Sequence, residues 1–209
     1  MSAPVYQFTI EATGVSAEDY LASYAADFYE WVQGKLIKMP PVSLHHNDLT
    51  AYLNDLLSAY FHFRPIGRTV SAPFVMTLEN THSRREPDLQ VILKTNPGQL
   101  TEAQMIGPAD ICIEVVSPES DQRDHGEKFV EYEQGGVGEY WIVDRLRNEC
   151  RFYRLNESGR YQSISVDDAD NYTSPLLPDF ALHVPTLWGR PLPSPPLVVE
   201  MIRTMLGIK

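Results

Sequence analysis

The stretch ICIEVVSPESDQRDHGEKFVEY, residues 111–132, decides the fold, because it begins as a strand and ends as a helix. Alternate residues of an extended strand point to opposite faces, and here both faces are apolar except at Glu114. Strands with two apolar faces are normally covered on both sides. A buried carboxylate is costly unless it has a charged partner, a proton or a metal ion, so Glu114 requires one of these.

The elements on either side complete a mixed α/β pattern. Ser16 followed by Glu18 and Asp19 predicts a helix that runs to about residue 29. A hairpin around Gln33-Gly34 and a helix capped by Asn47 or Asp48 follow. The remaining predicted elements are strands at 70–78, 88–93, 110–116, 139–144, 149–155, 160–166 and 180–184, a loop at 94–108, and helices at 124–134 and 198–206. We therefore expect a mixed α/β (α+β) fold with one central mixed sheet flanked by helices.

The bulk properties indicate a globular chain. Its 209 residues suit a single domain, 1–209, and 43% of them are hydrophobic. No apolar run is long enough to span a bilayer, and the N-terminus lacks a basic region followed by an apolar one, so we expect a cytoplasmic protein with no membrane partner. Two cysteines without a CxxC pair fit a reducing compartment. The net charge of −11 argues against a surface that binds nucleic acid by charge alone.

Asp88 and Glu114 are the first candidate site residues. Asp88 begins one predicted strand and Glu114 lies near the end of the next, so antiparallel pairing would bring both to one rim of the sheet. Two close carboxylates repel each other unless a proton or cation intervenes, and magnesium prefers such oxygen ligands. Lys128, early in the following helix, can fold back to the same rim, where it would orient a water nucleophile and stabilise charge on a phosphate.

Each of these residues also has a purely structural interpretation. Asp88 follows a proline, where aspartate often begins a strand or a turn. Glu114 could be neutralised by a salt bridge to Arg85 or Lys128 without any chemistry. Lys128 could be an ordinary solvated helix residue. The hypothesis of a site rests on the three residues converging at one place.

The segments REPDLQVIL (85–93) and ICIEVVSPESDQRDHGEKFVEYEQGGVGEYWIVD (111–144) closely resemble the Uma2 family. That family is similar to restriction endonucleases of the PD-(D/E)XK superfamily, and the resemblance runs from about residue 29 to 155. It implies a restriction-endonuclease-like core, which we place at 16–166, with a C-terminal extension at 167–209. It also implies Mg²⁺ or Mn²⁺ at the sheet rim and hydrolysis of a phosphodiester bond by metal-bound water.

The resemblance assigns roles to individual residues. Asp88 matches the aspartate of the P-D motif, and Glu114 matches the acidic residue of the second half-motif; both would bind the metal. The usual lysine position holds Val116, and Lys128 matches relatives whose lysine has moved to the next helix. Glu30 matches the glutamate of the first hairpin and would be an added ligand, direct or through water; alternatively it is an exposed hairpin residue.

Five further residues are candidates for supporting roles. His46 is expected to contact phosphate or the metal shell. Arg85 and Arg123, with Arg84, are candidates for contacts to backbone phosphates. Tyr132 lies one helical turn after Lys128 and would either fix the lysine or simply pack in the core.

The leading hypothesis is therefore a metal-dependent DNA endonuclease, with DNA as substrate. A homodimer is expected because cleavage of both strands requires two sites. Leu187, Trp188 and Leu197 could form its contact surface or could close the domain's own core. The alternatives are a catalytically inactive nuclease-like binding or assembly module, and a metal-dependent hydrolase of a smaller phosphoester.

Overall fold

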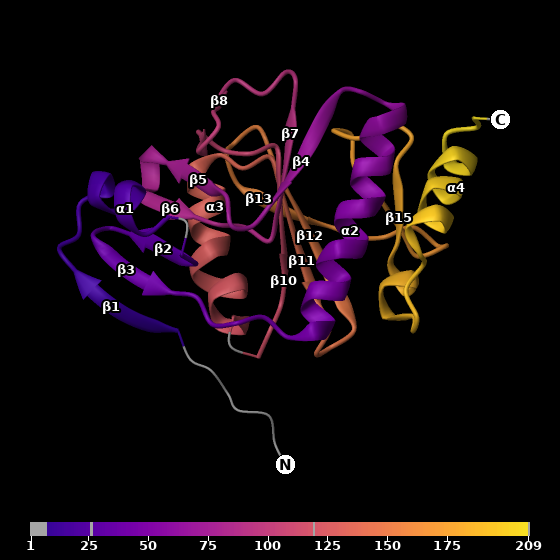
Figure 1. The fold of residues 1–209 in the computed structure, drawn as a ribbon. Coiled ribbons are helices and arrows are strands. Elements are labelled where there is room, and N and C mark those ends of the chain that lie inside the picture. The colour runs from indigo at the N-terminus through magenta and orange to yellow at the C-terminus, as the bar shows by residue number, and fades with distance from the viewer. Residues whose placement is uncertain (1–7, 26, 119, 209) are drawn as a thin grey trace, which may run out of the picture.

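The computed structural model describes residues 8–25, 27–118 and 120–208, and within them the chain forms two large mixed sheets and a small ribbon (Figure 1). This arrangement confirms the expected mixed α/β class. The expected central mixed sheet flanked by helices is present, and the structure adds a second large sheet, which lies across a helix from it.

The first sheet has the strand order β1-β3-β2-β6-β5-β9-β8. Its strands are β1 (Thr9–Thr13), β2 (Tyr29–Val32), β3 (Lys35–Lys38), β5 (Val75–Leu78), β6 (Ser83–Arg85), β8 (Gln99–Leu100) and β9 (Gln104–Ile106). We call it the N-terminal sheet.

The second sheet, which we call the central sheet, has the order β13-β12-β11-β10-β7-β4. Its strands are β4 (Gly67–Ser71), β7 (Leu89–Leu93), β10 (Ile111–Val115), β11 (Glu139–Asp144), β12 (Glu149–Leu155) and β13 (Tyr161–Ile164). A separate ribbon pairs β14 (Asn171–Thr173) with β15 (Ala181–His183).

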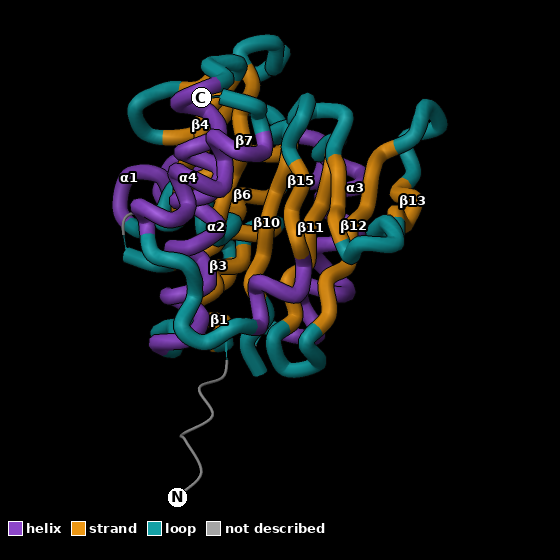
Figure 2. Tube along the Cα trace, turned by 90° about the vertical axis from the view of Figure 1, so that its right-hand side faces the viewer, coloured by secondary structure: helices purple, strands orange, loops and turns teal. Residues whose placement is uncertain are grey.

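The helices are α1 (Ala17–Ser23), α2 (Leu44–Phe63), α3 (Lys128–Gly135) and α4 (Pro195–Met205). A π-helical segment, Arg123–Glu127, leads into α3, and 3₁₀ turns lie at Glu79–Thr81 and Val184–Trp188. Helix α2 covers one face of the central sheet, while α3 lies between the central and N-terminal sheets (Figures 1 and 2). None of the helices in the described part of the chain is long and apolar enough to cross a membrane.

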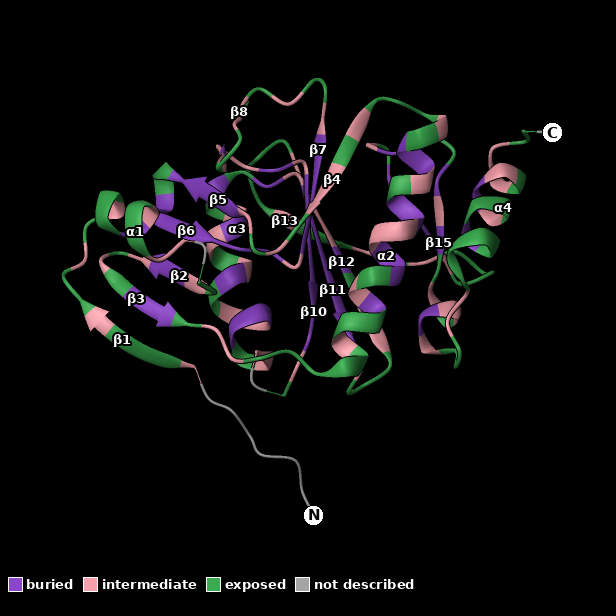
Figure 3. Ribbon diagram, in the orientation of Figure 1, coloured by how far each residue is buried: buried purple, intermediate pink, exposed green. Residues whose placement is uncertain are grey.

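Strand β10 is covered on both faces, as its sequence predicts. Ile111 and Ile113 pack in the core beneath α2, whereas Cys112 and Val116 pack in a second core with Tyr132 of α3. Figure 3 shows β10 and β11 in the buried colour over their whole length. Glu114 therefore belongs to the face that α3 covers.

The pairing of β10 with its neighbours sets the position of the site. It pairs antiparallel with β7, where Ile113 lies opposite Leu89, and parallel with β11. Asp88, one residue before Leu89, is thus brought beside the end of β10, which confirms the expected sharing of one rim. The parallel pairing requires a crossover, and the π-helical segment with α3 supplies it.

The start of α2 differs from the expected cap at Asn47 or Asp48. Helix α2 begins at Leu44, and the Ser43 hydroxyl accepts a hydrogen bond from the His46 amide at 3.2 Å. The first turn is solvent-exposed, so the apolar stripe that marks the helix in the sequence begins only at Leu49.

Replacing Ser43 with alanine is expected to destabilise the protein by about 1 kcal/mol, because the cap hydrogen bond is lost. Replacing Asn47 with alanine serves as the control, and its effect should stay within about 0.5 kcal/mol because Ser43, and not Asn47, holds the cap position. Urea unfolding monitored by circular dichroism measures both. Equal losses in the two variants would contradict the assignment of the cap to Ser43.

Other differences concern short or interrupted elements. The single strand expected at 70–78 is two strands, β4 and β5, in different sheets, because Pro73 between them cannot donate a ladder hydrogen bond. Strands of two or three residues carry too little periodicity to be recognised, which explains why β6 and β14 were not expected and why β8 and β9 lie in the expected loop. Helix α1 ends at Ser23, earlier than expected; Ala26, inside the expected range, lies outside the described residues.

The C-terminal segment closes the core of the domain. Leu187, Val198 and Ile202 are buried in the cluster that includes the inner face of α2, and α4 contacts α2. The suggestion that Leu187 forms a dimer contact is therefore wrong. Leu197 of α4 remains exposed.

Candidate active site

Four of the expected site residues line one cleft at the rim of the central sheet. The cleft has a volume of about 520 Å³, and His46, Asp88, Glu114 and Lys128 contribute to its wall. They come from α2, the residue before β7, the end of β10 and the start of α3. The rim is also bordered by the apolar loop 39–42 and by 115–118 and 145–146.

Asp88 is held in place by two hydrogen bonds. One carboxylate oxygen, Oδ2, accepts the amide hydrogen of Val115 at 2.7 Å and contacts Nε2 of His46 at 2.9 Å. Burial alone would lower the pKa of His46, but the Asp88 carboxylate outweighs it and the pKa is raised. His46 therefore orients Asp88 at the cleft wall.

Glu114 is buried, and its contacts with the described residues are made through one oxygen. Its Oε1 accepts the hydroxyl hydrogen of Tyr132 at 2.8 Å and lies 2.9 Å from Nζ of Lys128. Burial, with the nearby carboxylates of Asp124 and Asp88, raises the pKa of Glu114 to about 8, although Lys128 opposes the shift. Of the two salt bridges considered for Glu114, to Arg85 or to Lys128, the structure forms the one to Lys128.

Lys128 is surrounded by carboxylates and is only 2% exposed, so its interpretation as a solvated helix residue is wrong. Its ammonium lies 2.9 Å from Glu114, 3.4 Å from Asp124 and 3.6 Å from Glu30. Burial alone would lower the pKa of Lys128, but these three carboxylates raise it. The lysine is therefore cationic and fixed.

Glu30 lies in β2, behind the cleft, and is fully buried, so the alternative of an exposed hairpin residue is wrong. Its carboxylate accepts a hydrogen bond from Arg85 at 2.7 Å and contacts Arg123 and Lys128. Burial alone would raise its pKa, but Lys128, Arg123 and Arg85 lower it. Glu30 is not among the described residues that line the cleft, and its position supports the lysine.

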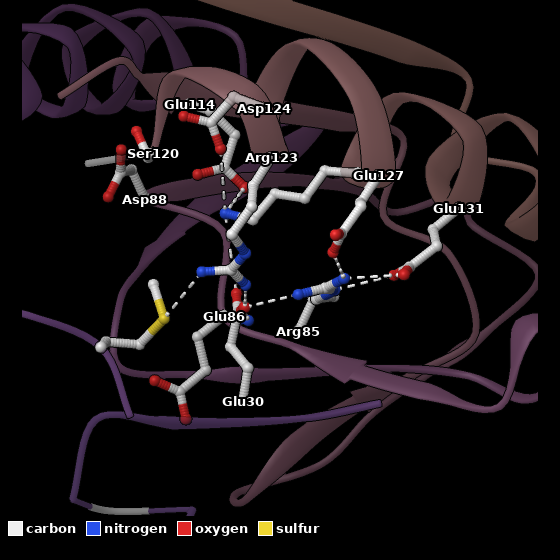
Figure 4. Close-up of polar contacts among 12 residues, drawn as sticks. Glu30, Arg85, Glu86, Asp88, Glu114, Ser120, Arg123, Asp124, Glu127 and Glu131 are labelled. Atoms are coloured by element: carbon white, nitrogen blue, oxygen red, sulfur yellow. Dashed lines mark hydrogen bonds and ion pairs between the residues drawn. The ribbon is translucent and has the colours of Figure 1, made fainter. Parts of the chain in front are cut away.

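The expected phosphate contacts by Arg85 and Arg123 are contradicted by the directions of their side chains. Arg85 is 0% exposed and binds Glu131 through two hydrogen bonds of 2.7 Å as well as Glu30. Arg123 also turns inward to Glu30 (Figure 4). Arg84 pairs with Glu79. The expectation for these three arginines rested on their short distance from the rim residues along the chain. Glu30 is buried, and the ion pairs with it turn the side chains of Arg85 and Arg123 toward the interior.

Two buried acids of the site were not identified from the sequence. Asp124 is 1% exposed and precedes Lys128 by four residues, a spacing that brings side chains together on a helix and could have revealed it. Glu86 is buried beside Tyr20, whose hydroxyl donates to it at 3.2 Å. Burial and the charge of Glu30 raise the pKa of Glu86 to about 8. No spacing pattern in the sequence marks Glu86.

A second group of possible metal ligands lies at the end of β11. Donor atoms of Asp121, His125 and Asp144 lie within 4.8 Å of one another. Arg147 already contacts both aspartates of this group. The charge of this cluster is therefore compensated by an arginine.

The donors in the cleft suit a hard divalent cation. Asp88 and Glu114 offer carboxylate oxygens on the cleft wall, and such ligands are preferred by Mg²⁺ and Mn²⁺. Oδ1 of Asp124 is buried and has no hydrogen-bond partner among the described residues. Glu114 and Asp124 share the ammonium of Lys128, so a bound cation would balance the remaining negative charge of the cleft carboxylates.

Comparison with known proteins bears on the family and on the fold. The Uma2 family model, described as "Putative restriction endonuclease", matches residues 17–187, a longer range than the motifs alone indicated. A solved structure from Anabaena variabilis, described as "a putative nuclease belonging to DUF820", has 16% sequence identity and a TM-score of 0.67, covering 82% of this chain and 96% of that chain. At this identity the likeness shows the fold. No curated protein matches the sequence.

Proposed function

The chain belongs to the Uma2 family, and we propose that it is a metal-dependent DNA endonuclease that hydrolyses phosphodiester bonds. One observation carries the proposal: Asp88, Glu114 and Lys128 line a single cleft at the rim of the central sheet. Two carboxylates and one ammonium are a sufficient set of charged groups for phosphodiester hydrolysis with a bound cation.

Asp88 and Glu114 would hold Mg²⁺ or Mn²⁺. When bound, the ion supplies positive charge at the phosphate and lowers the pKa of a coordinated water. The protein holds both ligands in fixed orientations: the Val115 amide and His46 fix Asp88, and the Tyr132 hydroxyl fixes Glu114. Such supporting hydrogen bonds normally tune ligand orientation and affinity.

Lys128 would act on the phosphate and the attacking water. Its ammonium is cationic, lies on the cleft wall, and keeps its position through contacts with acids on three sides. From there it would donate a hydrogen bond to a phosphate oxygen and stabilise the charge that develops during attack. Glu30 would support the lysine from behind, with its own charge balanced by Arg85 and Arg123.

A smaller phosphoester is the second candidate substrate, and the composition of the cleft wall favours it. Arg145 is the one arginine among the described residues that line the cleft, and the loop 39–42 narrows it with apolar side chains. A duplex normally requires several cationic contacts to its phosphates. The third candidate, an inactive binding module, is supported by the Lys128–Glu114 ion pair, which neutralises Glu114 without a metal.

A cleavage screen separates these candidates. The protein is incubated with Mn²⁺ or Mg²⁺, or with EDTA, and with supercoiled plasmid, linear duplex, single-stranded and branched DNA, and bis(p-nitrophenyl) phosphate. We expect cleavage of at least one DNA form that EDTA abolishes. Hydrolysis of the small diester alone would favour the second candidate, and DNA binding without cleavage would favour the inactive module.

Cleavage of both strands would require two copies of the site, so a homodimer in solution is part of this proposal. Light scattering coupled to size exclusion should give twice the mass of one chain. A monomer that only nicks plasmid would contradict this part of the proposal and leave the cleavage chemistry in place.

A further inference from the structure

Asp124 is a buried acid of the site, and the proposed mechanism uses it only as one of the three acids around Lys128. It lies in the π-helical segment, where an added residue widens the helical turn, and such segments often occur at functional sites. The residue is 1% exposed, and its Oδ1 has no hydrogen-bond partner among the described residues. Burial of an unpartnered carboxylate oxygen is costly, so it requires a reason.

The nearest cation to that oxygen is the ammonium of Lys128. Nζ lies 3.4 Å from Oδ1 of Asp124, too far for a strong hydrogen bond, and 2.9 Å from Oε1 of Glu114. Figure 4 shows Glu114 and Asp124 together on one side of the ionic network and Glu30 with Arg85 on the other. In this structure the ammonium of Lys128 is therefore closest to Glu114, while Oδ1 of Asp124 accepts no hydrogen bond from the described residues.

The Glu114 carboxylate cannot pair with the Lys128 ammonium and bind a divalent cation equally well. The same carboxylate is the partner of the lysine and a proposed metal ligand, and two cations near one carboxylate repel each other. Lys128 then needs another acceptor within reach. Glu30 is already bonded to Arg85 and Arg123, whereas Oδ1 of Asp124 is free of hydrogen bonds from the described residues.

We propose that Asp124 is a positioning residue, which accepts the ammonium of Lys128 when Glu114 binds the divalent cation. This inference rests on the proposed function, because it concerns the same metal site. By accepting the ammonium, Asp124 keeps Lys128 cationic and beside the phosphate. The Glu114 carboxylate is then available to the divalent cation. Without Asp124, Lys128 stays on Glu114 and competes with the metal.

A double-mutant cycle on metal binding tests this role. Mn²⁺ is titrated calorimetrically into the wild type, Asp124→Asn, Lys128→Met and the double variant. Removing Asp124 is expected to weaken Mn²⁺ binding about tenfold when Lys128 is present, a typical coupling within one ionic network. In the Lys128→Met background the same substitution should have little effect, because the competing ammonium is gone.

If Asp124 bound Mn²⁺ directly, or acted on the ion through its charge alone, the double-mutant cycle would give a different pattern. If Asp124→Asn weakens binding equally in both backgrounds, Asp124 is not acting through Lys128 and the inference is overturned. Asp121→Asn is the matched control, because it removes an acid three residues earlier that pairs with Arg147 and not with the lysine. The effect of Asp121→Asn on Mn²⁺ affinity should be small and independent of Lys128. If Asp121→Asn lowers the affinity more than Asp124→Asn does, the ion binds among Asp121, His125 and Asp144, and the inference is overturned.

Wild-type binding separates this inference from the proposed function. If the wild type binds no Mn²⁺ at all, the metal site itself is refuted, before any variant is considered.

If Asp124→Asn does not fold, reductive methylation of the wild-type protein, followed by mass spectrometry, gives a second test. Lys128 should stay as protected with Mn²⁺ as without it, because Asp124 and Glu30 retain it; a tenfold or larger rise in its methylation rate on adding Mn²⁺ would overturn the inference.

Discussion

Replacing Glu114 with glutamine is expected to reduce metal-dependent cleavage by about a thousandfold or more, the usual effect of removing an essential charge from a catalytic centre. The amide keeps the shape of the side chain and can still accept the Tyr132 hydroxyl hydrogen. It cannot supply the negative charge that a divalent cation requires. Initial rates of plasmid cleavage with Mn²⁺ measure the loss.

The matched control for Glu114→Gln is Glu133→Gln. Glu133 lies in α3 and pairs with exposed Arg160, away from the cleft-lining residues. Its replacement should leave the cleavage rate within about twofold of the wild type, because Glu133 is not among the described residues that line the cleft. Unfolding of both variants by urea confirms that the fold is intact. Full activity of Glu114→Gln would refute the assignment of Glu114 as a metal ligand.

Replacing Arg85 with methionine is expected to lower the free energy of unfolding by about 3–5 kcal/mol, because breaking a buried ion pair leaves an uncompensated charge inside the protein. Arg85 is 0% exposed and bridges Glu30 of β2 to Glu131 of α3. It therefore joins the N-terminal sheet to the helix that carries Lys128. Chemical denaturation measures the change.

Arg160→Met is the control for Arg85→Met. The side chain of Arg160 is 71% exposed and pairs with Glu133 at the surface, so its loss should cost less than about 1 kcal/mol. If Arg85→Met were as stable as the control, the buried ionic network would not hold α3 against the N-terminal sheet. Cleavage by the Arg85 variant should also fall, since Glu30 would no longer be fixed behind the lysine.

The ion pairs among Arg85, Glu30, Lys128 and Glu114 explain why a lysine from a helix lies at the rim of the central sheet. Glu30 and Arg85 come from the N-terminal sheet, Glu114 from the central sheet, and Lys128 from the helix between them. Glu30, Arg85, Glu114 and Lys128 each have an opposite charge beside them, and the ion pair of Asp124 with Lys128 is longer, at 3.4 Å. The layers are thus joined at the place where the chemistry is proposed.

Much of the site could be predicted from local patterns. The order of a strand beginning with Asp88 and a strand containing Glu114 was enough to predict a shared rim, because antiparallel pairing leaves few alternatives. The two apolar faces of residues 111–116 correctly indicated cover on both sides. Lys128 could be placed near the rim because the helix directly follows the strand.

The directions of the arginines could not be predicted. Arg85 and Arg123 lie near the rim in sequence, but the choice between solvent and interior depends on Glu30, more than fifty residues before Arg85 in the chain. Of the N-terminal sheet, the hairpin of β2 and β3 around Gln33-Gly34 was predicted, and the sheet as a whole was not, for a related reason. Its strands β6, β8 and β9 have two or three residues each, and only tertiary pairing defines them.

The most direct test of the metal site is a crystal structure determined after a Mn²⁺ soak, with the ion located from its anomalous scattering. We expect a peak within coordination distance of the carboxylates of Asp88 and Glu114, about 2.0–2.3 Å from their oxygens, and no such peak in crystals of the Glu114→Gln variant. A Mn²⁺ concentration that supports cleavage but gives no peak there, or a peak only among Asp121, His125 and Asp144, would contradict the assignment.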